Sequence, residues 1–327
     1  MIGRLRGAVV GAAIALVAMT GAAPAQTQLK VMVFPSFTNL ALLAAQAQGF
    51  FAKRGLTVEL LNTPNSEGLR DGLAKGDHQI VHGGVDNAVA MAEVAKLDVA
   101  VILGGDSGLN ALYAQPEIKS YEDLRGKTVI VDAPDTAFAL LLYKMLDVKG
   151  LKKGSYEVKP IGATPLRIEA MLKDKSLAAS MLNPPFSIRG ERGGLKSLGQ
   201  AVDVTGPYQS GSAWVMRSWG AAHGDVLVKY IQAYVEGLRW GLTPANREAA
   251  IALLAERLKL PSDIVAATYD MAKDPVRGFA VDAKFDLEGF RNVLKLRAEI
   301  LGQWGGQAPP PDKYLDFSYY QRALAGL

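Results

Sequence analysis

The sequence predicts an α/β protein in which two lobes face each other. Short apolar segments rich in β-branched residues alternate with helical segments over residues 29–104 and again over 128–182. This alternation is typical of mostly parallel sheets with covering helices. Polar loops follow the strands in both halves, and ligands of open α/β sheets bind at the carboxyl ends of strands. We therefore expect a ligand site between two lobes.

The first half opens with a βαβ unit. Leu29–Phe34 is an apolar strand that Pro35 ends, because proline cannot donate a ladder hydrogen bond. Ser36–Asn39 is a polar loop with helix-capping residues, and Gly55 is expected to end the alanine-rich helix that follows. The expected elements are strands at 29–34, 57–61, 79–81 and 99–104, and helices at 40–53, 67–75 and 88–95.

The second half repeats this order after a strand at 110–114 that leaves the first lobe. Its expected elements are strands at 128–131, 156–161 and 177–182, and helices at 137–146 and 166–172. Extended segments at 202–205 and 212–216 flank a return crossing, Gly206–Gly211. A helix is then expected to begin at residue 226, and three more are expected over 247–258, 262–273 and 287–301. An extended tail is expected from Pro309. These segments predict one lobe from residues 26–109 plus 212–327 and a second lobe from residues 110–211.

The N-terminal segment, residues 1–25, resembles a secretory signal. Arg4 and Arg6 precede a short apolar stretch, and Ala23-Pro24-Ala25 supplies small residues at a cleavage position. The alternative is a retained membrane helix. Because the chain has no cysteine, a lipidated N-terminal cysteine is excluded, and we expect a free periplasmic protein.

The composition of the chain argues against several classes of function. Lys and Arg number 36 and Asp and Glu 32, a near balance that gives no support for nucleic-acid binding. The lack of cysteine excludes disulfides, zinc–thiolate sites and cysteine nucleophiles. Three scattered histidines predict no metal site, and no hydrolase, metalloprotease or phosphate-loop motif is present. We expect no cofactor and no catalytic residues.

The candidate ligand site is a set of loops at strand ends. Helix N-termini there present free N–H groups and a partial positive charge, which suit anionic or polar ligand groups. Each polar residue in these loops has a second explanation, which is capping its own helix. The candidate ligand-binding residues are Ser36, Phe37, Thr38, Asn39, Asn65, Gly84, Val85, Asp86, Asp135, Thr136, Asn183 and Tyr208.

Charged and aromatic candidates have alternatives that the sequence leaves open. Asp86 either caps its helix or pairs with a cationic or N–H-bearing ligand group, with capping slightly favoured. Phe37 and Tyr208 lie in loops and are expected to form aromatic walls, whereas Trp214 is expected in the core. Three arginines near the expected loops could pair with a carboxylate or sulfonate ligand, but are interpreted first as solvated surface charges: Arg70, Arg167 and Arg189.

Three blocks of the sequence resemble the substrate-binding proteins of ABC importers for nitrate, sulfonate, taurine and thiamine-precursor pyrimidines. These blocks are Gln46–Glu59, Leu73–Asp77 together with Gly83–Asp86, and Asp123–Val129. At Asp174–Ser180 the chain lacks the glycine-x-valine-aspartate-alanine phrase that is frequent in this family.

The resemblance implies the type II periplasmic binding protein fold, in which two lobes joined by crossing strands close on a ligand. It implies a monomeric binding protein for a small sulfonate, carboxylate or pyrimidine-like molecule. The expected partners are a membrane permease and its ATPase. The alternatives are an enzyme on the same fold, such as a decarboxylase or pyrimidine synthase, and a secreted sensory binding protein.

Overall fold

The computed structural model describes residues 26–327. The expected signal peptide, residues 1–25, lies outside the described part. Within the described part, no helix combines the length and apolar character needed to cross a membrane.

The first sheet has the strand order β2-β1-β3-β10-β4. β1 pairs in parallel with β2 and β3, whereas β10 is antiparallel to both β3 and β4. We call the part of the chain around this sheet lobe 1. Its strands are β1 (Thr27–Val33), β2 (Leu56–Asn62), β3 (Ile80–Gly84), β4 (Val99–Leu103) and β10 (Gly211–Met216).

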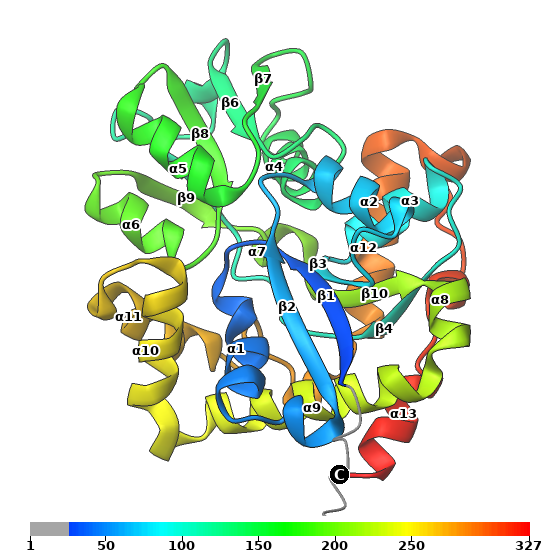
Figure 1. Cartoon of the computed structure of the whole chain (residues 1–327). Helices are drawn as coiled ribbons and strands as arrows, with labels where there is room; N and C mark the ends of the chain where they lie inside the picture. Colours follow the sequence, from blue (N-terminus) through cyan, green and yellow to red (C-terminus); the bar gives the residue numbers. More distant parts are fainter. Residues whose placement is uncertain (1–25) are drawn as a thin grey trace, which may run out of the picture.

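The second sheet, around which lobe 2 is built, has the order β7-β6-β8-β5-β9. Its arrangement matches the first: three parallel strands, then one antiparallel strand, then an edge strand. In Figure 1 this sheet lies above the first. Its strands are β5 (Ala111–Ala114), β6 (Thr128–Val131), β7 (Glu157–Pro160), β8 (Leu177–Leu182) and β9 (Lys196–Gln200).

The chain passes twice between the lobes. It leaves lobe 1 after β4 and places β5 antiparallel inside the second sheet. It leaves lobe 2 after β9 and places β10 antiparallel inside the first sheet. The two crossing segments, 104–110 and 206–210, are hydrogen-bonded to each other, since the N–H of Ser210 donates to the carbonyl of Asp106 at 3.1 Å.

Helices cover both faces of each sheet. In lobe 1 these are α1 (Leu40–Ala47), α2 (Ser66–Lys75), α3 (Asp86–Glu93), α8 (Arg217–Ala222), α9 (Gly224–Leu242), α10 (Arg247–Leu258), α11 (Ser262–Ala272), α12 (Leu287–Leu301) and α13 (Ser318–Ala325). In lobe 2 they are α4 (Ala137–Asp147), α5 (Thr164–Lys173), α6 (Phe186–Arg192) and α7 (Val202–Thr205). Figure 1 shows α9 along the base of the first sheet.

One hydrophobic core runs through both lobes. α12 packs against α4, so that Phe290 and Leu294 of lobe 1 belong to the same cluster as Leu140 and Val129 of lobe 2. A separate cluster joins α1 and α9 to the other face of the first sheet. The lobes are therefore held side by side by apolar packing as well as by the two crossing segments.

Several sequence expectations about local structure are wrong. Residues 202–205, expected to be extended, form α7, because acidic Asp203 stands in the first turn and Gly206 leaves the helix at φ +69°. The helix expected over 40–53 ends at Ala47. The tail expected to be extended after Pro309 contains α13, where Asp316 accepts a hydrogen bond from the N–H of Ser318 at 3.1 Å.

Candidate functional site

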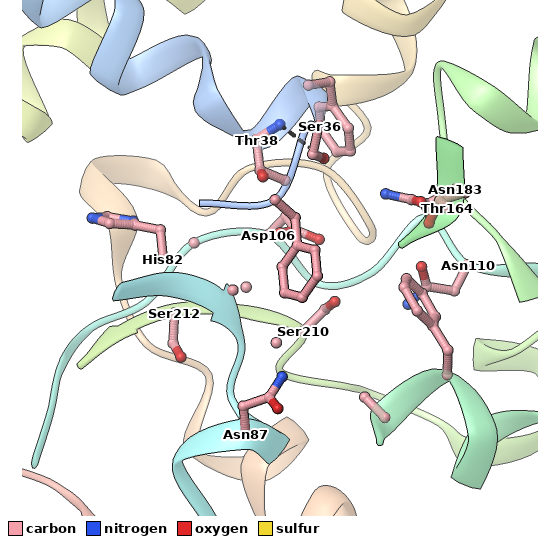
Figure 2. A pocket seen from close by; sticks show the side chains of 18 of the residues that line it. Ser36, Thr38, His82, Asn87, Asp106, Asn110, Thr164, Asn183, Ser210 and Ser212 are labelled. Atoms are coloured by element: carbon pink, nitrogen blue, oxygen red, sulfur yellow. Dashed lines mark hydrogen bonds between the residues drawn. The ribbon is translucent and has the colours of Figure 1, made fainter. Parts of the chain in front are cut away.

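A cavity of about 100 Å³ lies between the two lobes. Figure 2 shows Asp106, Ser210 and Asn110 around one central space, with Ser36 and Thr38 above them in the view. Both lobes and both crossing segments contribute to its wall. The lining residues are Phe34, Pro35, Ser36, Phe37, Thr38, Ser66, His82, Gly83, Gly84, Asn87, Gly104, Gly105, Asp106, Leu109, Asn110, Asp132, Thr136, Ala137, Phe138, Ala163, Thr164, Arg167, Asn183, Ser210, Gly211, Ser212, Tyr234 and Phe279.

The loop after β1 forms one wall of the cavity. Ser36 accepts a hydrogen bond from the N–H of Thr38 at 3.3 Å and so caps a short helical turn. Asn39 fixes the same loop by donating its amide to the carbonyl of Phe34 at 2.9 Å. Phe37 is buried and meets Phe279 edge to face, with ring centroids 5.6 Å apart. Local capping thus holds an aromatic and two hydroxyl side chains at the cavity.

The end of β3 and the start of α3 form the next part of the wall. His82 is hydrogen-bonded through Nε2 to the hydroxyl of Tyr230 at 2.8 Å, and burial lowers the pKa of this imidazole to about 3. The side chain is therefore neutral at pH 7. Within residues 26–327, the buried side-chain oxygens of Asn87 and Ser212 have no hydrogen-bond partner. These oxygens are available to a ligand.

The first crossing segment supplies a buried carboxylate. Asp106 is 5% exposed and accepts a hydrogen bond from the N–H of Gly108 at 2.9 Å. Burial raises the pKa of Asp106 to about 6, against the opposing effect of that hydrogen bond. Gly211 is needed beside it, because a Cβ atom there would stand 2.2 Å from a carboxylate oxygen. A negative charge is thus held between the two crossing segments at pH 7.

A second carboxylate follows β6 directly. Asp132 is 6% exposed, and its Oδ2 accepts a hydrogen bond from the hydroxyl of Ser66, which belongs to lobe 1. The other oxygen, Oδ1, is buried and has no partner among the described residues. A buried carboxylate oxygen without a donor is costly to the folded protein, so this atom is a strong candidate for ligand contact.

Arg167, on α5, is fully buried at the wall of the cavity. Its guanidinium donates to Ser180 at 3.0 Å, to Thr164 at 3.1 Å, to the carbonyl of Met181 at 3.1 Å and to the carbonyl of Gly162. It also lies over the ring of Phe138, 5.0 Å from the centroid. Burial lowers the pKa of Arg167 to about 10, although the carboxylate of Asp132 opposes this effect. The side chain remains charged at pH 7.

Six of the twelve expected ligand-binding residues line the cavity: Ser36, Phe37, Thr38, Gly84, Thr136 and Asn183. The amide oxygen of Asn183 accepts a hydrogen bond from the hydroxyl of Thr164 at 2.9 Å. Gly84, expected in a loop, instead ends β3 and pairs with Gly211. The cavity therefore includes residues from four of the expected strand-end loops.

The other six do not line this cavity. Asn39 fixes its own loop, and Asn65 caps α2 by accepting from the N–H of Gly68 at 2.8 Å. Val85 and Tyr208 are buried in the core. Asp135 pairs with Arg70 at 3.4 Å.

Asp86 follows neither of its two expected roles. Its carboxylate forms a buried ion pair with Arg297 of α12, with Nη1 and Oδ1 2.7 Å apart. No capping bond from its side chain is present at the start of α3. Desolvation raises the pKa of Asp86, opposed by the adjacent guanidinium. This carboxylate therefore belongs to the core and not to the cavity.

The sequence analysis missed several lining residues. Arg167, interpreted as a surface charge, is fully buried, and that interpretation is wrong. Asp132 immediately follows β6, and Asp106 lies in the segment after β4, which ends at Leu103, so both occupy strand-end positions where ligands of open α/β sheets bind. Phe279 comes from the loop between α11 and α12, and its sequence neighbourhood holds no signal for the cavity. Within the described chain, no group of three or more His, Cys, Asp or Glu residues is placed to hold a metal ion.

Sequence comparison identifies the family. The profile of the NMT1-like family matches residues 22–255, which is more than half of the chain. The chain belongs to the NMT1-like family. A curated relative from Escherichia coli (strain K12), named as an aliphatic sulfonates-binding protein, is 28% identical over 155 residues. That match covers 47% of this chain and 46% of the relative, so it spans about half the length of each.

Solved structures confirm the expected fold. The periplasmic nitrate-binding protein NrtA from Synechocystis PCC 6803 superposes with a TM-score of 0.79 at 14% identity, covering 94% of this chain and 90% of that one. The periplasmic aliphatic sulphonate-binding protein SsuA from Escherichia coli gives 0.69 at 18% identity, with 88% and 92% covered. At these identities the likeness shows the periplasmic binding protein fold alone, and the ligand has to be argued from the cavity.

Proposed function

We propose that this protein is the periplasmic solute-binding component of an ABC importer. The observation that supports this most is the position of the cavity: its wall is shared by lobe 1, lobe 2 and the two crossing segments. A ligand held there contacts both lobes at once, and so stabilises the closed arrangement over an open one. The names of the relatives, which include nitrate- and sulfonate-binding proteins, support the same role.

Direct contacts between the lobes support a closed state. Besides the Ser66–Asp132 hydrogen bond, the N–H of Ala163 in lobe 2 donates to the carbonyl of Pro64 in lobe 1 at 2.8 Å. Arg192 and Asp263 form an ion pair across the rim at 2.6 Å. In this proposal these contacts break when the lobes open about the crossing segments, and residues 26–109 plus 212–327 move as one body against residues 110–211.

The proposal includes export by residues 1–25, a monomeric protein, and delivery of the ligand to a permease driven by its ATPase. It also holds that the ligand is released unchanged. Among residues 26–327, neither Asp106 nor Asp132 has a histidine as a hydrogen-bond partner, so the hydroxyl of Ser66 that donates to Asp132 lacks an adjacent base of the kind that activates a serine nucleophile. Recovering an altered ligand after incubation would contradict this part.

Lobe closure can be measured directly. The chain has no cysteine, so a single cysteine can be placed on each lobe at the exposed positions Lys152→Cys and Lys229→Cys and labelled for energy transfer. We expect periplasmic extract or a solute library to shorten the distance between the dyes, and a protein with the label pair on lobe 1 alone, Lys53→Cys with Lys229→Cys, to show no change. An unchanged distance with every solute, together with an unchanged melting temperature, would overturn the binding role.

A further inference from the structure

We infer that the cavity takes a ligand that presents N–H donors or a positive charge to Asp132 and Asp106, and that it discriminates against simple anions such as nitrate and alkanesulfonates. This inference rests on the proposed solute-binding function and specifies the ligand class of the same cavity. It departs from the ligands named for the relatives, and from the small organic anion that we expected first. The charges, hydrogen bonds and burial of the lining residues support it.

Among the described residues that line the cavity, the side-chain charges at pH 7 sum to a net negative charge. Asp106 and Asp132 supply two carboxylates, Arg167 supplies one guanidinium, and His82 is neutral. Both carboxylates are more than nine-tenths buried, so solvent screens them weakly. Among the side chains, a simple anion entering this space meets two buried carboxylates and one guanidinium, and the carboxylates disfavour it.

Arg167 is the single cationic side chain among the described residues that line the cavity, and its N–H groups already donate hydrogen bonds within the protein. Arg167 uses four of its five N–H groups on oxygens of the protein. Its flat face is covered on one side by Phe138. The two parallel N–H groups that a guanidinium offers to a sulfonate, nitrate or carboxylate are therefore not free here.

Asp132, by contrast, has an acceptor that the protein leaves open. Its Oδ2 is satisfied by Ser66, whereas Oδ1 is buried without a partner in the described part of the chain. On the lobe 1 side, the unpartnered amide oxygen of Asn87 adds an acceptor, and the unpartnered hydroxyl of Ser212 can either accept or donate. This surplus of acceptors is complementary to a ligand that donates hydrogen bonds.

Helix N-termini at the cavity add partial positive charge. α2, α4 and α5 begin at the cavity wall, where Ser66, Ala137 and Thr164 line it. Each N-terminus corresponds to about half a positive charge, so together they offset the net side-chain charge, and the discrimination rests on the open oxygen of Asp132 and the occupied guanidinium of Arg167. These N–H groups suit a carbonyl or ring-nitrogen acceptor on the same ligand, while the five rings from Phe34, Phe37, Phe138, Tyr234 and Phe279 suit a flat apolar body.

A matched series of three flat probes tests the inference. Benzamidine, benzamide and benzoate have nearly the same shape and carry a positive charge, no charge and a negative charge. We expect isothermal titration and thermal shift to rank the affinities benzamidine, benzamide, benzoate, with at least a tenfold difference between the first and last. Nitrate and methanesulfonate are expected to bind no better than benzoate.

Three variants separate ligand contact from lobe closure. Asp132→Asn keeps the shape and an acceptor for Ser66, and is expected to reduce the benzamidine-to-benzoate affinity ratio at least tenfold. Ser66→Ala removes the bond between the lobes but keeps the carboxylate, and is expected to weaken all probes while benzamidine still binds at least tenfold more tightly than benzoate. Asp135→Asn, on the same loop but outside the cavity lining, is the charge-matched control and should leave the ratio unchanged.

Two results would overturn the inference. If benzoate, nitrate or methanesulfonate binds the wild-type protein more tightly than benzamidine, the discrimination is wrong, while the solute-binding function stands. If the anions are disfavoured but Asp132→Asn leaves the ratio unchanged, Asp132 does not recognise the ligand. Failure of the proposed function is a different outcome, because it requires that no probe or extract closes the labelled lobes.

Discussion

Arg297 and Arg167 are both fully buried, and their surroundings differ in one respect. Arg297 faces the carboxylate of Asp86 at 2.7 Å, so the two charges cancel inside the core of lobe 1. Arg167 faces neutral oxygens from Thr164, Ser180 and two carbonyl groups, and the carboxylates of its region remain unpaired by it.

The difference separates a structural charge site from a binding site. In the Asp86–Arg297 pair each charge has its counter-charge in direct contact, so no net charge is left for a ligand to neutralise. At the cavity, the guanidinium is neutralised by no direct carboxylate contact, and Asp132 retains an open oxygen. Neither burial nor an open hydrogen-bonding atom is sufficient to identify a functional charge, since Oδ2 of Asp86 and Nη2 of Arg297 are also buried without a partner among the described residues. Asp132 differs from them because it lines the cavity.

The largest expected change in stability comes from breaking the ion pair between Asp86 and Arg297. Asp86→Ala leaves the Arg297 guanidinium buried without its counter-charge, and we expect a loss of about 3–5 kcal/mol of unfolding free energy. Urea unfolding followed by circular dichroism measures it. The double variant Asp86→Leu with Arg297→Met should recover most of the loss, and folded Asp86→Ala should keep the probe selectivity of the wild type. A stable Asp86→Ala protein with lost binding would move this residue into the ligand site.

The next effect has the opposite sign and depends on pH. Burial raises the pKa of Asp106 from 3.8 to about 6, so its charged form destabilises the folded protein above pH 6. Asp106→Asn should therefore be more stable than the wild type by on the order of 3 kcal/mol at pH 7.5. The gain should shrink to about 1 kcal/mol at pH 4.5 and vanish below 3.8, where the carboxyl is protonated in both states. A difference that stays constant over this range would contradict the assignment.

A smaller loss is expected at the cavity arginine. Arg167→Met removes four hydrogen bonds to neutral oxygens without leaving a directly paired carboxylate behind, and we expect a loss of about 2 kcal/mol in unfolding free energy. Arg167→Lys should restore little of it, because a single ammonium group cannot reach the same four acceptors. Equal losses for Arg167→Met and Asp86→Ala in parallel urea titrations would erase the distinction between the two sites.

The smallest effect concerns closure. Ser66→Ala removes one hydrogen bond across the cleft, and we expect the closed state to lose about 1 kcal/mol. In the labelled protein this should appear as a several-fold higher probe concentration at half closure, with the melting temperature of the free protein nearly unchanged. No shift in the half-closure concentration would show that this bond forms equally in the open state.

The fold could be predicted from the sequence, and six of the twelve residues expected to bind ligand line the cavity. Short buried strands and capping residues are local patterns, so the alternation of elements and the positions of Ser36 and Thr136 could be predicted. The partner of Asp86 lies 211 residues further along the chain, and no local pattern indicates which arginine meets which carboxylate. Arg167 looks like a surface residue in sequence because two of its four acceptors, Ser180 and Met181, lie on β8 and not on its own helix.

The exchange of β5 and β10 between the lobes also affects the order in which the chain can fold as it is synthesised. All five strands of the second sheet lie within residues 111–200, whereas the first sheet lacks an interior strand until Met216 has emerged. Until then β3 and β4 have no strand between them, and their facing edges stay unpaired. The lobe begun first is thus completed last, and about two thirds of the polypeptide must exist before its sheet can close.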